Sequence, residues 1–156
     1  MQITGDVAEI QCLPNYVTMR FMENASVVGS NFSVSGDCIE IDTTPHASVA
    51  CVDASAVGEM RAIGNASFIL RTCSGKANRI IIIPGEKIVK LIGGAELEDP
   101  RAGRVRSDSL SFDVATGRVA TEILNSGRAC ISMDGTAQPE NFNFHARGKD
   151  DEPTIR

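Results

Sequence analysis

Hydrophobic and polar residues alternate along most of the chain in short runs that turn residues separate. Near the start, the runs 7–13 and 16–22 alternate on either side of Pro14-Asn15, a pattern that predicts a β-hairpin. No apolar stretch with helical spacing is long enough to predict a helix, and Val, Ile and Thr fall between Gly, Pro, Asn and Asp. A strand with every second residue apolar buries one face. The chain is therefore predicted to be all β, with one apolar interior.

A unit of paired strands recurs three times, over residues 24–52, 64–92 and 94–123. Each copy contains a short first strand, a polar step, an alternating strand, a tight turn and a return strand. The predicted turns are 43–46, 84–85 and 115–117. Repetition of this kind is typical of stacked units that bury their apolar faces against one another. We expect about a dozen or more short antiparallel strands stacked in register with the repeats.

The length of 156 residues and a hydrophobic content of 42% fit one domain with a continuous core. We expect residues 1–146 to form that single domain, because no linker divides them. Residues 147–156 are charged and patternless, as expected for a disordered tail. At Ile80–Ile83 both faces of the strand are apolar, which predicts that part of its outer face is also covered.

Composition and charge disfavour several functions. A net charge of −5 and an aromatic content of 4%, without Trp, offer little to nucleic acid. The two histidines, His46 in a predicted turn and His145 near the tail, do not suggest a catalytic or metal site. Five cysteines without a C-x-x-C pair disfavour zinc. We therefore expect neither an enzyme nor a cofactor or metal site, and no 18-residue apolar stretch predicts a membrane span.

Cys38 and Cys51 are spaced symmetrically about the predicted turn at Thr44-Pro45. A hairpin centred there places the two residues directly opposite each other, at close to disulfide distance. Either a disulfide or two small side chains packed as neighbours satisfies this spacing. A periplasmic location favours the disulfide and a cytosolic one favours free thiols.

The stretch from Gly93 to Val119 carries a family resemblance. Its Gly-Gly-Ala-Glu-Leu-Glu, Ser-Asp-Ser-Leu-Ser-Phe-Asp and Ala-Thr-Gly-Arg-Val segments resemble the OstA-like, or LptA, family of lipopolysaccharide-transport proteins. Residues 64–92 match fairly and residues 23–52 more weakly. The resemblance implies an open, twisted β-jelly roll of stacked antiparallel strands. It also implies an apolar groove that carries acyl chains across the periplasm without any catalytic residue.

The resemblance, together with the residues that repeat on one face of successive strands, predicts the lining of the groove. We expect it to consist of Phe21, Phe32, Ile41, Phe68, Ile82, Leu91, Leu110 and Phe112. The implied ligand is lipopolysaccharide or another acyl lipid. The implied protein partners are similar jelly rolls or further copies of this chain, joined end to end through the terminal strands at 7–13 and 141–145.

A periplasmic location, with a leader trimmed before Met1, is the expectation that the resemblance favours, and a cytosolic location stays open. A different class of function makes the same demands on the sequence. A structural β-repeat protein of a surface, fibre or virion would also alternate in this way, with its apolar face filled as a simple core. The lipid carrier requires an open groove, whereas the structural protein requires a filled interior.

Overall fold

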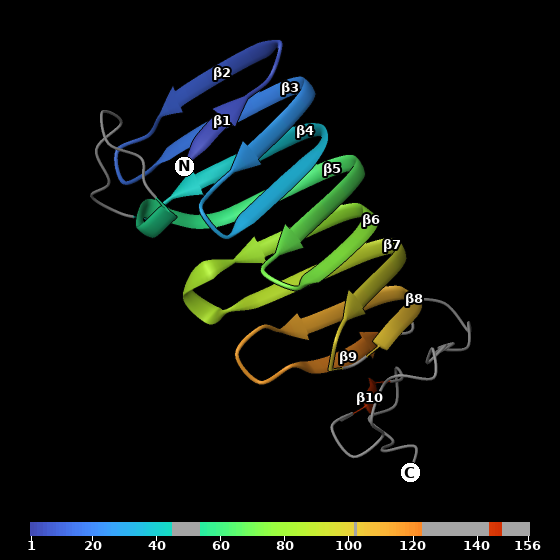
Figure 1. The fold of residues 1–156 in the computed structure, drawn as a ribbon. Coiled ribbons are helices and arrows are strands. Elements are labelled where there is room, and N and C mark those ends of the chain that lie inside the picture. The colour runs from blue at the N-terminus through green and yellow to red at the C-terminus, as the bar shows by residue number, and fades with distance from the viewer. Residues whose placement is uncertain (45–53, 102, 123–143, 148–156) are drawn as a thin grey trace.

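The structure is a computed structural model that describes residues 1–44, 54–101, 103–122 and 144–147. These residues form a single open sheet of 10 strands, which confirms the predicted all-β, open jelly roll (Figure 1). The strands are β1 (Gln2–Thr4), β2 (Val7–Cys12), β3 (Val17–Val28), β4 (Phe32–Thr43), β5 (Val57–Leu70), β6 (Cys73–Ile83), β7 (Ile88–Asp99), β8 (Gly103–Asp113), β9 (Arg118–Glu122) and β10 (Phe144–Arg147). Two single turns of 3-10 helix, η2 (Ala54–Ala56) and η3 (Pro84–Glu86), connect strands. Among the described residues, no helix is long and apolar enough to cross a bilayer.

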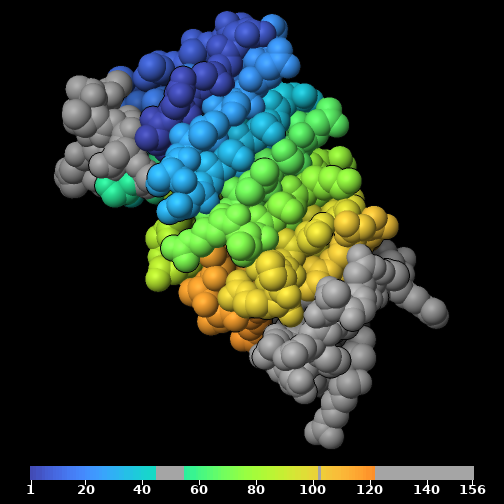
Figure 2. Space-filling view, viewed as in Figure 1, coloured from blue at the N-terminus to red at the C-terminus, as the bar shows by residue number. Residues whose placement is uncertain are grey.

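The strands follow one another along the stack in nearly the order of the sequence. From β3 to β9 each strand pairs antiparallel with the next, and β10 joins β9 in parallel. Figure 2 shows these strands as diagonal bands along the elongated molecule. At the N-terminal end, β1 and β2 both flank β3, β2 along its first half and β1 along its second. Each therefore extends a different layer of the stack.

Each long strand bends sharply near its middle, so that its two halves lie in different layers (Figure 1). The strands β3, β5 and β7 each contain two consecutive residues with positive φ, and the pairing register shifts at those places. The pairs are Glu23-Asn24, Gly64-Asn65 and Gly93-Gly94. A left-handed pair inside a strand is a bulge that turns the chain away from its line. Two of these three pairs begin with glycine, which adopts positive φ without strain.

A short polar side chain from the neighbouring strand or turn packs against each bend. Asn24 donates from Nδ2 to Asp6 Oδ2 at 3.3 Å, and Asn65 donates from Nδ2 to Asp37 Oδ2 at 3.3 Å. At the third bend, a Cβ on Gly93 would lie 2.8 Å from Asn78 Nδ2. Asp and Asn side chains thus gather at the bends, where short polar side chains satisfy local donors and acceptors.

The core lies between the two layers. An alanine follows each bend directly, and Ala25, Ala66 and Ala95 are each at most 2% exposed. Small side chains there let the layers approach closely, since the interior must be filled without gaps or clashes. Larger side chains fill the space farther from the bends, among them Ile39, Ile41, Ile80, Leu91, Leu97, Leu110 and Phe112.

Several predicted elements are confirmed. The hairpin about Pro14-Asn15 is formed by β2 and β3, with Leu13 N donating to Tyr16 O at 2.9 Å. The turns at 84–85 and 115–117 connect β6 to β7 and β8 to β9. The predicted short strands differ in length from the observed ones, because each of β3 to β8 joins two of them through a bend. Of the predicted terminal strand at 141–145, residues 141–143 lie outside the described residues, as does the tail after Arg147.

The predicted hairpin about Thr44-Pro45 is wrong. β4 pairs with β5, in which Thr43 lies opposite Val57, so the strand that returns begins at 57. Cys38 has Met22 on one side and Ile63 on the other, and it is a free cysteine. Both of its neighbouring positions in the sheet are therefore occupied. Cys51 itself lies outside the described residues, and the geometric basis for pairing it with Cys38 is lost.

The bend at Gly64 provides a test of the fold. Gly64 has φ of +78°, and a Cβ there would meet the side chain of Asp37. Gly64→Ala should lower the free energy of unfolding by about 1–3 kcal/mol, because both the backbone and Asp37 would be strained. Urea denaturation followed by circular dichroism measures this loss. Gly85→Ala is the matched control, since nothing lies within 4 Å of its Cβ position. Equal stability of the two variants would contradict the assigned bend.

Candidate functional site

An apolar cavity of about 280 Å³ opens between the two layers, on the side of the stack away from the bends. Its walls come from β4 to β7 and from the turns beside them. Lys87 is the only charged side chain among the described residues that line it. The lining residues are Met1, Phe32, Val34, Val57, Met60, Phe68, Ile69, Leu70, Ile82, Ile83, Pro84, Lys87, Ile88, Val89 and Val114.

The two halves of β5 form opposite walls of the cavity. In the first half, Met60 lies opposite Ile82 of β6, which lies opposite Val89 of β7. In the second half, Phe68 lies opposite Val34 of β4. Directly opposed residues in a sheet share one face, so each row presents a continuous apolar surface to the other. The bend at Gly64-Asn65 is what turns these two surfaces toward each other.

Gly75 determines where the ring of Phe68 lies. The two residues are directly opposed on β5 and β6, and a Cβ on Gly75 would lie 2.5 Å from Phe68 Cε1 and 2.9 Å from Leu91 Cδ2. The ring therefore lies over β6 at the position where Gly75 has no side chain. A glycine in the interior of a strand commonly marks such a close approach. Gly75 thus shapes one wall of the cavity.

From β7 onward, the interior side chains of the described strands are enclosed. Leu97, Val105, Leu110, Phe112 and Val119 are each at most 1% exposed. Their side chains fill the space that the cavity occupies between β4 and β7. The interior is therefore open toward the N-terminal half of the stack and closed toward β9.

Arg101 fastens the two layers together at this closed end. Its Nε donates to Asp99 Oδ1 at 3.1 Å, and its Nη2 donates to Asp99 Oδ2 at 3.2 Å. The carboxylate is buried, and the guanidinium lies against Gly117 in the turn of the opposite layer, where a Cβ would be 2.9 Å from Arg101 Cζ. A bidentate pair of this kind has a fixed geometry. It holds the turns of both layers in contact at this end.

The structure brings three of the eight predicted groove residues to the cavity. Phe32, Phe68 and Ile82 line it, whereas Phe21 is half-buried beside the core. The other four, Ile41, Leu91, Leu110 and Phe112, are enclosed in the core. The alternation correctly places all eight residues on the inner side of the sheet. Their distance from the bends, and hence their burial, determines which of them reach the opening.

Sequence reasoning missed much of the lining, including Val57, Met60 and Lys87. The prediction of a return strand at 47–52 hides Val57 and Met60, which lie on β5 instead. The spacing of Met60 and Ala62 is itself a period-2 signal that could have revealed β5. Lys87 follows the Pro-Gly-Glu turn, and nothing in the hydrophobic pattern marks it.

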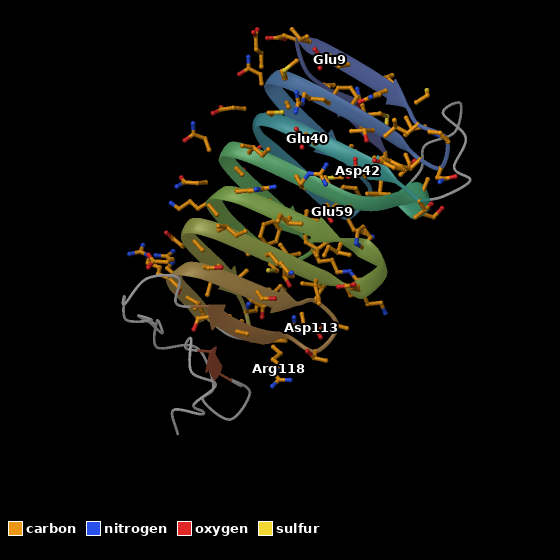
Figure 3. The ribbon with its side chains drawn as sticks, turned by 180° about the vertical axis from the view of Figure 1, so that it is seen from behind. Glu9, Glu40, Asp42, Glu59, Asp113 and Arg118 are labelled. Atoms are coloured by element: carbon orange, nitrogen blue, oxygen red, sulfur yellow. The ribbon has the colours of Figure 1, made fainter. Side chains whose placement is uncertain are left out.

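A network of charged side chains lies on the outer face of the layer formed by the first halves of β3 and β5, well separated from the interior. Figure 3 shows Glu9, Glu40, Asp42 and Glu59 on this face. Pairing places Glu9, Arg20, Glu40 and Arg61 in one row across β2, β3, β4 and β5, so that acid and base alternate. Opposite charges directly across a strand pair stabilise its register.

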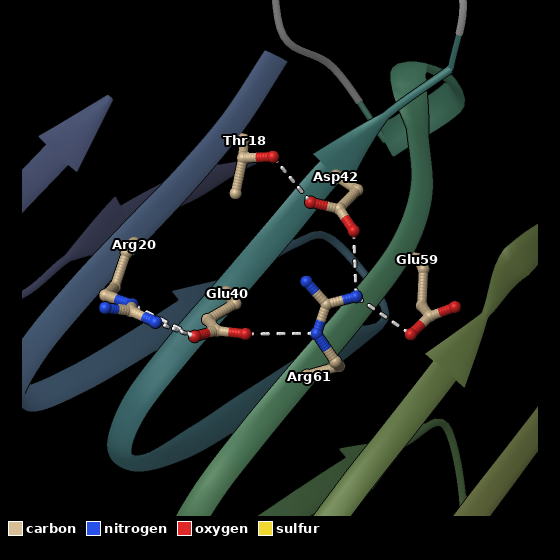
Figure 4. Close-up of polar contacts among 6 residues, drawn as sticks. All are labelled: Thr18, Arg20, Glu40, Asp42, Glu59 and Arg61. Atoms are coloured by element: carbon tan, nitrogen blue, oxygen red, sulfur yellow. Dashed lines mark hydrogen bonds and ion pairs between the residues drawn. The ribbon is translucent and has the colours of Figure 1, made fainter. Parts of the chain in front are cut away.

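Arg61 is the centre of this network (Figure 4). It donates from Nε to Glu40 Oε2 at 3.1 Å, and from Nη1 to Asp42 Oδ2 at 2.8 Å and to Glu59 Oε1 at 2.9 Å. Arg20 completes the row with Nη2 2.6 Å from Glu40 Oε1. Each of these charged groups has a partner of opposite sign, which identifies the network as a structural brace between strands.

The charges in the network shift the pKa values of its members. The hydrogen bond from Arg20 is the main reason that the pKa of Glu40 lies below its ordinary value, and Arg61 adds to it. Burial works to raise the pKa of Asp42, but hydrogen bonds from Arg61 and Thr18 outweigh it and lower that pKa. The hydrogen bond to Asp42 chiefly raises the pKa of Arg61. Both carboxylates therefore stabilise the folded chain in their charged form.

The surroundings of two cysteine thiols make them unreactive. Burial raises the pKa of Cys73 to about 12 and also raises the pKa of Cys38. A thiol is a nucleophile only when it is deprotonated, so neither serves as one at neutral pH. Within the part of the chain that the structure describes, no group of three His, Cys, Asp or Glu residues could hold a metal ion.

Comparison with known proteins identifies the fold. No family model and no curated protein matches the chain. Among solved structures, the chain resembles LptH from Pseudomonas aeruginosa, described as the LptA-homologous periplasmic component of the conserved lipopolysaccharide transport device. The TM-score is 0.66 over 88% of this chain and 94% of that one, with 13% identity. The chain therefore has the open β-jelly-roll fold of this class, as the motifs in 93–119 predicted.

The Arg61 network predicts a dependence of stability on pH. Arg61→Met keeps the apolar stem and should lower the free energy of unfolding by about 1–2 kcal/mol at pH 7. Because the pKa values of Glu40 and Asp42 are depressed in the folded state, this stabilisation is present above about pH 4.5 and fades as the pH falls through the folded values. Urea denaturation between pH 7 and 3 should show the two proteins converging.

Arg79→Met is the control for this experiment. Arg79 is an exposed arginine on the adjacent strand β6, and its loss should change the free energy of unfolding by at most about 0.5 kcal/mol at any pH. A difference between wild type and Arg61→Met that stayed constant down to pH 3 would show that the carboxylates are not stabilised by Arg61.

Proposed function

We propose that this protein is a periplasmic lipid-binding protein that shelters the acyl chains of lipopolysaccharide in its cavity and helps to carry them between membranes. The observation that supports the proposal is an apolar, open-sided cavity of about 280 Å³ in a fold shared with LptH, the periplasmic component of a lipopolysaccharide transport device. Of the residues predicted for the groove, Phe32, Phe68 and Ile82 contact the acyl chain in this proposal. The others support the walls from behind.

The energetics of an acyl chain fit this cavity. Each methylene group that leaves water for an apolar site gains about 0.8 kcal/mol. A chain with eight to ten buried methylenes therefore gains roughly 6–8 kcal/mol before the entropy of binding is subtracted. This is enough for reversible binding, which a carrier requires, and no catalytic group takes part.

The alternative, a structural β-repeat protein, predicts an interior that is filled along its whole length. The region between β7 and β9 would suit it, since Leu97, Leu110 and Phe112 are fully enclosed there. The cavity between β4 and β7 favours the carrier, because an apolar opening of that size lowers stability unless something occupies it.

Self-association is a second part of the proposal. Every residue of β2 is exposed, and in the described part of the chain β2 pairs only with β3. Its other edge therefore presents free N–H and C=O groups, which can add a strand from another chain. Ile10 lies opposite Met19, on the inner side of the sheet, yet it is 56% exposed. We propose that the β9–β10 end of a second copy, or of a similar jelly roll, covers this end.

Substitutions on two faces of β6 test the carrier function. Ile82 lines the cavity and Ile81 is half-buried on the opposite face of the same strand. Ile82→Trp should fill part of the cavity and weaken binding of a fatty acid at least about tenfold, whereas Ile81→Trp should leave it unchanged. Displacement of a fluorescent probe by dodecanoate measures both, with thermal unfolding as a check on folding. Equal affinities in folded variants would place the ligand elsewhere, and absence of binding to the wild type would refute the proposal.

A charge on the edge strand tests self-association. Wild-type protein should show an increase in mass with concentration in light scattering, and Ile10→Lys should shift it toward the monomer, because a charged side chain blocks pairing at an edge. Val28→Lys is the control, since Val28 is similarly exposed but lies on β3, between β1 and β4. A wild type that stays monomeric at high concentration would argue against end-to-end contact.

A further inference from the structure

Lys87 is held at the rim of the cavity by backbone contacts with two turns. Its N–H donates to Pro84 O at 3.1 Å within the turn between β6 and β7, and its carbonyl oxygen accepts from Val114 N at 2.9 Å in the turn after β8. Its φ of 56° places it in the left-handed region. The residue is exposed, yet it contributes to a lining that is otherwise apolar.

The ammonium group of Lys87 has no ion pair with any residue in the described ranges. Lys76, by comparison, is paired with Glu96, and Arg61 and Arg101 are paired as described above. Glu86 precedes Lys87 in the chain but does not line the cavity. A lysine beside an apolar wall keeps its charged end in water while its stem covers the wall. Its charge is therefore available to a ligand that enters the cavity.

The size of the cavity limits which ligands can enter. A cavity of about 150 Å³ holds one benzene molecule, so the 280 Å³ here admits a segment of one alkyl chain rather than several chains side by side. The filled core and the Arg101 pair close the far end toward β9. A chain that enters at the open side therefore keeps its polar head outside, near the rim.

We propose that the cavity binds single alkyl chains with an anionic head, a carboxylate or a phosphate, and that Lys87 pairs with this head at the rim. The proposal rests on the lipid-binding function above and adds to it the class of head group and the number of chains. For a lipid with several chains, it means that one chain at a time occupies the cavity.

Three ligands with the same tail and different heads test this inference. Tridecanoate, dodecyl phosphate and dodecanol, which share the same dodecyl tail, would each displace N-phenyl-1-naphthylamine, a neutral fluorescent probe. The wild type should bind both anions about three- to fivefold more tightly than dodecanol, the ratio that an exposed ion pair supports. Lys87→Glu should abolish or reverse this preference and leave the affinity for dodecanol unchanged. Lys87→Arg should retain it.

Lys90→Glu is the matched control, because Lys90 is an exposed lysine on β7 that does not line the cavity. It should keep the order of the three affinities. If Lys87→Glu and Lys90→Glu behave alike, or if the wild type does not distinguish anions from dodecanol, the assignment of Lys87 is wrong while the cavity remains a lipid site. If only one anion responds to Lys87→Glu, that head group is the one recognised. If none of the three displaces the probe, the lipid-binding function itself fails.

Discussion

Pairs of left-handed residues in the middle of β3, β5 and β7 determine the shape of this molecule. Each pair bends its strand, so the two layers of the jelly roll are halves of the same strands rather than separate sheets. The alanine after each bend allows the layers to meet there. The layers then diverge away from the bends, and this divergence creates the space that becomes the cavity.

Side-chain volume along the stack decides how much of that space remains open. Toward β9, large side chains such as Leu110 and Phe112 fill it, and Arg101 joins the two layers through Asp99 and Gly117. Between β4 and β7, the ring of Phe68 lies over Gly75 and leaves an opening. The same bend thus yields a filled core at one end and a lipid-sized cavity at the other. The outer network around Arg61 braces the wall without reaching the interior.

Alternation of apolar and polar residues was sufficient to predict the fold class and the inward-facing residues, because period 2 in a strand fixes the face of each side chain. It could not predict the partner of β4. Residues 47–52 and 57–62 both look like a return strand, and the turn signal at Thr44-Pro45 favoured the nearer one. The cavity could not be predicted from the sequence either, because alternation places Phe32 and Phe112 on the same side of the sheet but does not indicate which of them is enclosed. The bend at Glu23-Asn24 lacks glycine and so gave no signal.

The proposed function depends on the cavity holding an acyl chain. Native mass spectrometry of protein purified without detergent tests it most directly, because a bound lipid adds its mass to that of the chain. We expect one acyl-lipid adduct per chain in the wild type, and its loss in Ile82→Trp but not in Ile81→Trp. A wild-type spectrum that shows the bare chain alone, and that stays unchanged after incubation with dodecanoate, would contradict it.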